Sequence, residues 1–420
     1  MNPNRIKPLA QDFQKIAESP DPKTIYAYTP GLAALPNGGL ILTMEFGGPG
    51  VPGSLPRAAR FGRPHLGSAY LSHDGGHTWR HVVDYPISHS RPFAAGTTLY
   101  ILGQDGDLAV IRSDDMGQTW TEPRFLTHGE SWHQSACSVW YDKGCVYLVM
   151  ERVMPHGGNP WPVSACMPVL MRAPVDADLT LRESWTFARS MTFEQAVNAG
   201  NLDWFGVPFY PEEETAHYPA PNRGCAPIGW LETNVVKILD PSHYWHDPTG
   251  STFHLFARAH TGGTGYCAVM KAVERADGTI DTMCETVPSG RRSALLPMPG
   301  GQMRFHLIYD EPTKLYWLLS SQATDSMTRA ELLGPDRYNL PNNERHRLQL
   351  HFSRNCVDWC FAGIVAIGET PRCSRHYASM LAVGEDLLIA SRSGDTNAAS
   401  AHNGNFISLH RVRDFRSLVY

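Results

Sequence analysis

The sequence predicts an all-β chain, folded as one β-propeller of four-stranded antiparallel blades. Three observations lead to this fold class. A turn motif of eight residues is repeated, strand-like runs recur in pairs along most of the 420 residues, and no long helical periodicity interrupts them. The 37 glycines and 32 prolines suit a chain with many turns. Short strands separated by regular turn signals are typical of sheets repeated around an axis.

The turn motif is the strongest sign of a repeat. Residues Ser72–Trp79 and Ser113–Trp120 both fit Ser-x-Asp-x-Gly-x-Thr-Trp, and the second copy begins 41 residues after the first. A degraded third copy begins at Ser353 and has Asn355 in place of the aspartate. The aspartate can accept backbone N–H groups in a tight turn whose glycine takes a positive φ. We therefore interpret the motif as a device that stabilises turns, and we assign no chemistry to its aspartate.

Strand-like runs divide the chain into six similar units, each with two runs joined by a turn and a third run after them. The paired runs are Gly31–Phe46, Arg91–Gly103, Gln134–Val153, Glu232–Ala259, Gly301–Ser321 and Tyr377–Arg392, and the third runs are Gly67–Ser72, Leu108–Ser113, Pro168–Ala173, Gly265–Ala272, Leu348–Ser353 and Gly404–Val412. We predict six blades in one domain over residues 1–420, with seven as the alternative count because fourth strands are hard to recognise. Residues Gln11–Ala17, before the first blade, show a weakly helical pattern.

Composition excludes several classes of function. The formal net charge is −5 and no basic stripe is present, so nucleic-acid binding is not expected. No run of 18 apolar residues exists, which excludes a membrane-spanning helix. Nine scattered cysteines indicate reduced thiols rather than a disulfide framework. Residues 1–20 lack the apolar region of a signal peptide, so we expect a cytoplasmic protein, or a periplasmic or secreted one if a signal was removed.

With these repeats the chain resembles the sialidase-like β-propellers, in which this motif, the Asp-box, joins the third and fourth strands of a blade. In that geometry Asp-boxes lie on one face. The loops from second to third strand and between blades lie on the opposite face, where such propellers place their active sites. The histidines expected on that face are His65, His89, His128, His133, His156, His217, His260, His376 and His402. The face also receives the long insertion 189–230, with Trp204, Tyr210 and Tyr218. Long loops of this kind are usually functional.

Two arginines that the resemblance to sialidases would imply are missing. A sialidase has an Arg-Ile-Pro motif on the first strand of blade one, where this chain has Tyr28-Thr29-Pro30. It also has a Glu-x-Arg pattern, where this chain has Glu45-Phe46-Gly47. Because those arginines grip the sialic acid carboxylate, sialidase activity ranks second among our hypotheses.

The chain more closely resembles the lyases and related propeller enzymes that act on rhamnose–uronic acid glycans, such as the ulvan lyases. The matching stretches are Trp132–Ser135, Met150–Arg152, Met171–Leu179, Gly229–Val236, Pro299–Gly301 and Ala401–Phe406. In the rhamnosyl-glucuronate enzymes a histidine important for activity precedes a Gly-Pro-Gly-like loop, and Glu45 occupies that position here. The resemblance implies β-elimination at a uronic acid.

Elimination needs a cation that neutralises the sugar carboxylate, a base with a pKa near 7, and an acid for the leaving oxygen. We predict His133 as base or acid with Tyr210 or Tyr218 as partner, and Arg258 as the carboxylate clamp, supported by His402 or Arg392. Glu45 is a substitute base, a ligand of a substrate hydroxyl, or the sign of a different substrate. The expected substrate-binding residues are Arg91, Trp204, His260, Arg392 and His402. The sequence demands no cofactor, although a metal ion can assist such chemistry.

The sequence leaves three functions open: a lyase on uronic-acid glycans, an exo-glycosidase of sialidase-like type, and a carbohydrate-binding propeller without catalysis. In each case the expected partner is an oligosaccharide or polysaccharide. The loops 189–230 and 322–347 can narrow the channel into an exo-type pocket or equally form the interface of a homo-oligomer.

Overall fold

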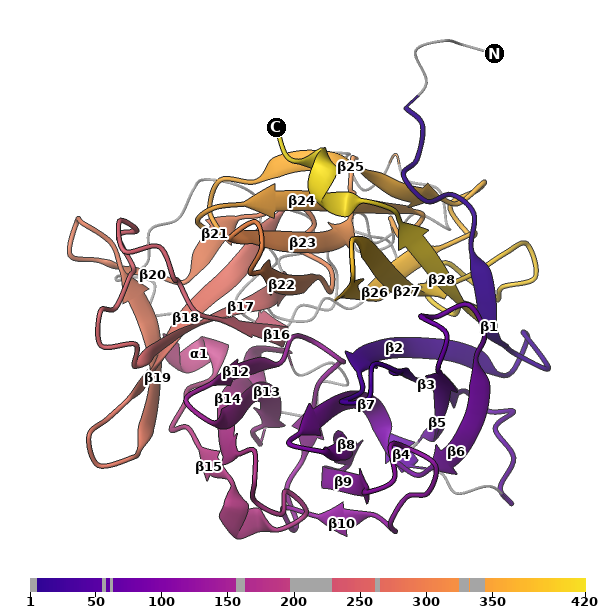
Figure 1. Cartoon of the computed structure of the whole chain (residues 1–420), viewed down its shortest axis with the longest axis horizontal. Coiled ribbons are helices and arrows are strands. Elements are labelled where there is room, and N and C mark those ends of the chain that lie inside the picture. Colours follow the sequence, from indigo (N-terminus) through magenta and orange to yellow (C-terminus); the bar gives the residue numbers. More distant parts are fainter. Residues whose placement is uncertain are drawn as a thin grey trace.

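A computed structural model describes residues 6–54, 58–60, 63–155, 163–196, 229–260, 265–324, 332 and 344–420. These residues form six antiparallel sheets arranged around a central axis, which confirms the six-bladed propeller (Figure 1). The short helical turns are η1 (Val163–Ala165), η2 (Arg182–Ser184), α1 (Phe193–Ala196) and η4 (Phe415–Leu418). No helix among the described residues is long and apolar enough to cross a membrane.

The strands of a blade follow one another outward from the axis in chain order, except that β4 pairs outside β5 in blade one and β1 is outermost in blade six. Blades one to three contain β2 (Tyr26–Ala34), β3 (Leu40–Gly47), β4 (Ala58–Arg60), β5 (Arg63–Ser72) and β6 (Arg80–Tyr85); β7 (Ser88–Ala95), β8 (Thr98–Asp105), β9 (Asp107–Ser113) and β10 (Arg124–Phe125); and β11 (Trp132–His133), β12 (Trp140–Asp142), β13 (Cys145–Val153), β14 (Cys166–Pro174) and β15 (Thr186–Phe187).

Blades four to six complete the ring. They contain β16 (Gly229–Val236), β17 (Thr252–His260), β18 (Tyr266–Glu274), β19 (Ile280–Thr286), β20 (Arg292–Ser293) and β21 (Leu295–Pro297); β22 (His306–Asp310), β23 (Leu315–Ser321), β24 (Arg347–Ser353) and β25 (Cys360–Ile367); and β26 (Arg375–Val383), β27 (Asp386–Ser393), β28 (Phe406–Val412) and, as the outer strand, β1 (Gln14–Glu18).

The N-terminal strand corrects one expectation. The weakly helical stretch Gln11–Ala17 is wrong as a helix, because Gln14–Glu18 pairs antiparallel with β28 and forms the fourth strand of blade six. Figure 1 shows β1 beside β28, so the two ends of the chain close the ring together. Ala17 is buried in that blade. The helical pattern was local, whereas the partner strand lies almost 400 residues away.

The hydrophobic core is divided among the spaces between blades. Six large clusters of buried side chains each join two neighbouring blades, as Leu148 of β13 and Leu102 of β8 do between blades two and three. The middle strands are buried on both faces, which explains why β13 and β23 read as continuous apolar runs rather than alternating ones. The blades therefore stabilise one another, and a single blade has no core of its own.

The Asp-box turns have the predicted structural role. Oδ1 of Asp74 accepts the backbone N–H of Thr78 at 2.8 Å, and its Oδ2 accepts the Thr78 hydroxyl at 2.6 Å. The second copy repeats both bonds from Asp115 to Thr119. In the degraded copy Oδ1 of Asn355 accepts two backbone N–H groups in the same way. All three turns follow the third strand of a blade, as predicted.

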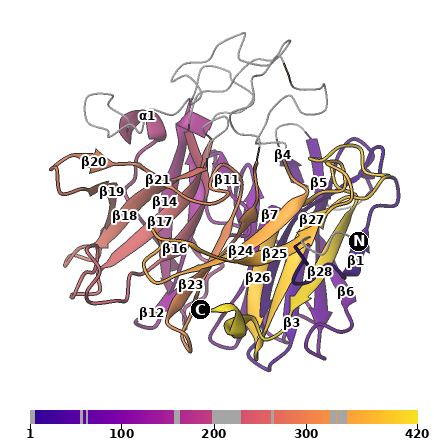
Figure 2. The ribbon, with the colours of Figure 1, turned by 90° about the horizontal axis from the view of Figure 1, so that it is seen from above.

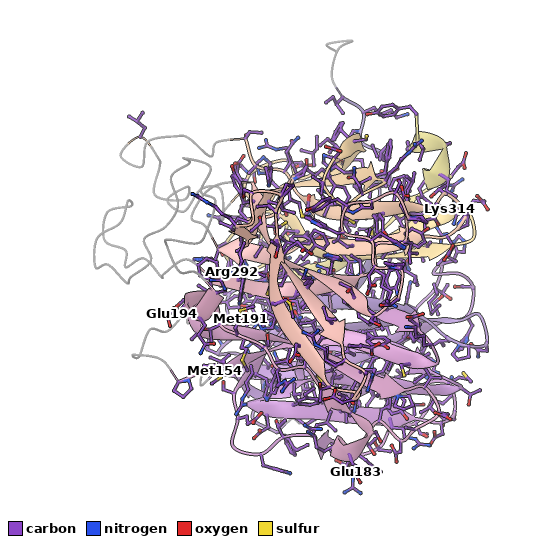
Figure 3. The ribbon with its side chains drawn as sticks, turned by 90° about the vertical axis from the view of Figure 1, so that its left-hand side faces the viewer. Met154, Glu183, Met191, Glu194, Arg292 and Lys314 are labelled. Carbon is purple, nitrogen blue, oxygen red and sulfur yellow. The ribbon has the colours of Figure 1, made fainter. Side chains whose placement is uncertain are left out.

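The strand directions define two faces. The first strands β2, β7, β16 and β26 begin on the face where the second strands end, and the Asp-boxes lie on the opposite face. Figure 3 shows the separation: Met154, just after β13, lies on the side opposite Lys314, which is in the turn between β22 and β23. In the side view of Figure 2 the blades appear edge-on between these two faces. We call the face that holds Met154 the upper face.

Candidate active site

Four first strands carry a β-bulge near the upper face, and each bulge holds one residue with positive φ. These residues are Thr29, His89, Glu232 and Tyr377, with φ of 28°, 51°, 57° and 50°. The bulges appear as register shifts in the pairs β2–β3, β7–β8, β16–β17 and β26–β27. Bulges redirect side chains, and strained left-handed conformations in non-glycine residues gather at functional sites. The repetition in four blades marks this end of the axis as the candidate site.

Arg258, on β17, joins the bulge residues of blades four and six. Its Nη1 donates to the hydroxyl oxygen of Tyr377 at 2.7 Å and to Oε2 of Glu232 at 3.3 Å. Its Nε donates to the carbonyl oxygen of Gln302 at 2.8 Å, which fixes the guanidinium. Burial raises the pKa of Tyr377, and the charge of Arg258 opposes that rise. The tyrosine is therefore protonated at neutral pH, and a carboxylate stands next to it.

Two further arginines flank Tyr377. The guanidinium carbons of Arg345 and Arg392 lie 5.7 and 5.4 Å from the centre of its ring. Nη1 of Arg345 lies 3.1 Å from Nδ1 of His376. Arg392 also lies 4.0 Å from the centre of the Tyr28 ring. Among the described residues neither arginine forms an ion pair with a carboxylate.

This cluster has more positive than negative charge. Burial lowers the pKa of Arg345 to about 9, because desolvation disfavours the charged guanidinium. Among the described residues Arg258 pairs with Glu232, whereas Arg345 and Arg392 have no carboxylate in an ion pair. Buried cations without counter-ions favour an anionic ligand, and guanidinium groups bind carboxylates well. The cluster is therefore suited to bind the carboxylate of a ligand.

Histidines surround Glu45 on the other side of Tyr28. Oε1 of Glu45 lies 2.9 Å from Nε2 of His89, and Oε2 accepts the backbone N–H of His89 at 2.9 Å. Nδ1 of His65 lies 3.4 Å from the same Oε2. Burial alone would raise the pKa of Glu45, but the two histidines hold it well below its usual range. Tyr28 stacks on His65 with the ring centres 5.8 Å apart, which connects this group to Arg392.

Glu151 and His133 lie behind these groups. Glu151 is fully buried, and burial raises its pKa to about 8, so the carboxyl is mainly protonated at neutral pH. Its Oε1 accepts the N–H and the hydroxyl of Thr233 at 3.0 and 2.7 Å, directly beside Glu232 in the chain. Nδ1 of His133 lies 3.8 Å from Oε2 of Glu151, and its ring centre lies 5.6 Å from that of His89. The contacts thus form a continuous ring around the axis.

The structure brings together several of the predicted site residues. Glu45, His133, Arg258 and Arg392 all belong to the ring of contacts described above. His402 lies at its exposed rim, where Nδ1 is 3.2 Å from Nη2 of Arg392. His260 lies at the end of β17, and burial together with the charge of Arg258 lowers its pKa to about 3. Trp204, Tyr210 and Tyr218 lie outside the described residues.

Arg91 lies elsewhere than the sequence suggested. It is buried in the axial channel beneath the site, where Nη2 donates to the carbonyl oxygen of Ser135 at 3.0 Å. Arg304 is buried in the same channel and donates to the carbonyl oxygen of Ala378 at 2.7 Å. Arg91 faces a separate cavity of about 510 Å³ on the lower face. The structure therefore does not bring Arg91 to the Tyr377 cluster.

Sequence reasoning missed Tyr377 and Arg345 as site residues and gave Glu232 no partner. Tyr377 and Glu232 sit within predicted strands, where alternation assigns side chains to one sheet face or the other. The bulges break that alternation. The signal that the sequence offers is a polar residue two places after each of them, Asn234 after Glu232 and Ser379 after Tyr377, just before the apolar end of the strand. That signal is weak in a single sequence.

Comparison with known proteins shows the fold. No protein-family model and no curated protein matches the chain. Among solved structures it is similar to the Hadza microbial sialidase Hz136, with 13% identity and a TM-score of 0.57 over 97% of this chain and 69% of that one. It is similar to the Trypanosoma rangeli sialidase in complex with sialic acid, with 12% identity and a TM-score of 0.54 over 97% of this chain and 60% of that one.

A third solved structure, a mutant of the NanB sialidase from Streptococcus pneumoniae, has 10% identity and a TM-score of 0.54 over 96% of this chain and 70% of that one. The chain thus spans about 60 to 70% of the length of these three proteins. At such low identity the likeness establishes the architecture alone: this chain has the six-bladed propeller fold that these sialidases also contain.

Proposed function

We propose that the protein is a carbohydrate-active enzyme, a retaining glycoside hydrolase that removes a terminal sugar acid from a glycan. The observation that carries the proposal is that Arg258 binds Tyr377 and Glu232 with the same nitrogen, beside the guanidinium groups of Arg345 and Arg392. The site thus combines three arginines that can bind the carboxylate of a sugar with a tyrosine, Tyr377, for which Glu232 can act as the base.

The three arginines would hold the carboxylate of the sugar and fix the anomeric carbon near Tyr377. The hydroxyl oxygen of Tyr377 already accepts from Arg258, and the negative charge of Glu232 acts on the same hydroxyl, so Glu232 is the base that we assign to its proton. Attack forms a bond from that oxygen to the anomeric carbon, the glycosidic bond breaks, the tyrosine proton passes to Glu232, and an acid protonates the leaving oxygen. Water then attacks the anomeric carbon and gives its proton to the conjugate base of that acid, the bond to the tyrosine oxygen breaks, and the tyrosine regains its proton from Glu232.

A tyrosine nucleophile points to the class of sugar. Most retaining glycosidases use a carboxylate, but a carboxylate would be repelled if the anomeric carbon itself carried a carboxylate. A neutral hydroxyl activated by Glu232 avoids that repulsion. Glycosides of 2-keto sugar acids are therefore the preferred substrates. The fold that the chain shares with the three sialidases supports this choice. This chain has Tyr28 where the sialidase Arg-Ile-Pro motif has its arginine, so the sugar acid need not be sialic acid.

Elimination at a uronic acid, the function favoured from the sequence, is the second candidate. The same arginines could neutralise a uronate carboxylate, and the histidines around Glu45 supply acid and base groups. Elimination, however, requires no nucleophile, so it gives Tyr377, Glu232 and Arg258 no chemical role as a group. The three solved structures with the same fold are those of sialidases, which is a further support for hydrolysis.

The test is a panel of 4-methylumbelliferyl glycosides of 2-keto sugar acids and of uronic acids, read by fluorescence, with rhamnose–uronate glycans read by absorbance near 235 nm. Tyr377→Phe removes the nucleophilic oxygen and keeps the ring. Tyr244→Phe, at a side chain that is 71% exposed, is the matched control. Release from a 2-keto acid glycoside that is lost only in Tyr377→Phe supports the proposal.

The covalent intermediate gives a second readout. A difluorinated 2-keto sugar acid should leave a stable adduct on the peptide that contains Tyr377, detected by mass spectrometry. A rise at 235 nm without fluorescence would instead establish elimination. If neither signal appears and Tyr377→Phe binds glycans as tightly as the native protein, the protein is a binding module and the proposal fails.

A further inference from the structure

The reaction proposed above needs a proton donor for the leaving oxygen, and neither Tyr377 nor Glu232 can serve, because both act on the other side of the anomeric carbon. We propose that His65 is this general acid, and that it returns as the base for water, with Glu45 and His89 as the residues that position it. The inference rests on the proposed function. It assigns a role that the sugar-binding cluster, which consists of Tyr377, Glu232, Arg258, Arg345 and Arg392, does not supply.

The positions of protons on His89 follow from its partners. Its Nδ1 lies 2.6 Å from the carbonyl oxygen of Gln134, and because a carbonyl oxygen only accepts, Nδ1 carries a proton. Its Nε2 lies 2.9 Å from Oε1 of Glu45, within the distance of an ion pair. Glu45 has a pKa well below its usual range, since the neighbouring histidines outweigh its burial. An ionised carboxylate this close to Nε2 favours a second proton there, and we infer that His89 is an imidazolium beside Glu45.

The same reasoning fixes the tautomer of His65. Its Nδ1 lies 3.4 Å from Oε2 of Glu45, and an ionised carboxylate only accepts. The nearness of this carboxylate favours a proton on Nδ1, so we assign Nε2, on the far side of the ring from Glu45, as the atom that gives and takes the catalytic proton. A carboxylate that holds one histidine nitrogen and leaves the other for the substrate is the arrangement found in hydrolytic triads.

His89 has a distinct part in this group. It already supplies the positive charge that balances Glu45, so His65 is not required as a counter-ion and can lose its proton without leaving Glu45 unpaired. Both ring nitrogens of His89 are engaged by Gln134 and Glu45, which makes His89 a positioning residue rather than the donor. His133 lies behind His89 against Glu151, farther from the sugar-binding cluster.

The placement of His65 suits transfer to a bound sugar. The ring stacks on Tyr28, with an angle of 28° between the planes, and Arg392 lies 4.0 Å from the centre of the same Tyr28 ring. The groups that face His65 are thus Glu45 from β3, His89 from β7 and Tyr28 from β2. His65 connects the carboxylate clamp to the Glu45–His89 pair, where a leaving group next to the anomeric carbon would lie.

The test compares two leaving groups in His65→Ala. On a glycoside with a sugar alcohol as leaving group, which needs protonation, kcat/KM should fall about 10²–10⁴-fold. On a nitrophenyl glycoside, whose leaving group departs without a proton, the bond-breaking step should change less than about tenfold. Azide should restore turnover by attacking the intermediate and yield a glycosyl azide. His81→Ala is the control, because His81 is exposed and paired with Asp84 at 2.8 Å.

Glu45→Gln tests the positioning role. The amide can donate to Nδ1 and so reverse the tautomer of His65, which should cost as much on the alcohol substrate as His65→Ala and spare the nitrophenyl substrate. The limb of the pH profile that reports the acid should disappear in both variants. Equal losses on both leaving groups, without azide rescue, would show that His65 is only structural and overturn the inference. That outcome is distinct from failure of the proposed function, in which the native protein cleaves neither substrate.

Discussion

Replacing Glu151 by glutamine should remove a large pH dependence from the stability of the protein. Burial, reinforced by the nearby Glu232, raises the pKa of Glu151 to about 8 in the folded state, against about 4.3 in an unfolded chain. Between these values the folded protein keeps a proton that the unfolded chain has released. Stability from this group is therefore full at low pH and is lost as pH rises towards 8. The whole difference is about 5 kcal/mol, at 1.36 kcal/mol per pKa unit.

Glutamine imitates the protonated carboxyl, because its oxygen can still accept both bonds from Thr233. Urea unfolding at pH 5, 7 and 9 should show that the native protein loses about 4 kcal/mol relative to Glu151→Gln between pH 5 and 9. The difference between the unfolding free energies of the two proteins removes the contribution of the histidines, because these titrate in both proteins. Glu183→Gln, at an exposed position, should show no such trend. Parallel curves for the native protein and Glu151→Gln would refute the reasoning.

Three further outcomes are expected. Arg258→Met should lower the free energy of unfolding by about 3–5 kcal/mol in urea titrations, because it leaves Glu232 buried without its cation; no change would contradict the ion pair. Arg392→Leu should reduce kcat/KM for a sugar acid about a hundredfold, mainly through KM, since a carboxylate ligand is lost; unchanged kinetics would remove it from the clamp. Ala17→Lys should destabilise the ring by about 2–4 kcal/mol and expose β1 to limited proteolysis, whereas Lys15→Ala should not.

The fold could be predicted because its signals are local. The Asp-boxes set the turn after the third strand, and runs such as Cys145–Met150 are continuously apolar because the strand is buried on both faces. The order of the strands and Asp-boxes along the chain then predicts which loops lie on each of the two faces. The closing strand Gln14–Glu18 could not be predicted, since its partner β28 lies at the other end of the chain and its own pattern suggests a helix.

The candidate site was predictable only in part. Glu45 was found because it stands where the rhamnosyl-glucuronate enzymes have a histidine, and Arg258 because elimination requires a cation on the predicted active face. Tyr377 was not, because a tyrosine at the start of a strand is ordinary, and only a bulge turns it towards the axis. Its pairing with Glu232 through Arg258 crosses from blade six to blade four. No spacing within a single sequence encodes a contact of that kind.

The pairing of β1 with β28 has a consequence for the biosynthesis of the protein. A ribosome releases Gln14–Glu18 long before Phe406–Val412 exists, so the first strand has no partner during nearly all of translation. Tyr377 and Arg392 also belong to this last blade. Ring closure and assembly of the sugar-binding cluster are therefore the same late event, and a nascent chain has no complete site. Until then the open ring exposes an apolar blade surface, which makes the nascent chain a substrate for chaperones and prone to aggregation.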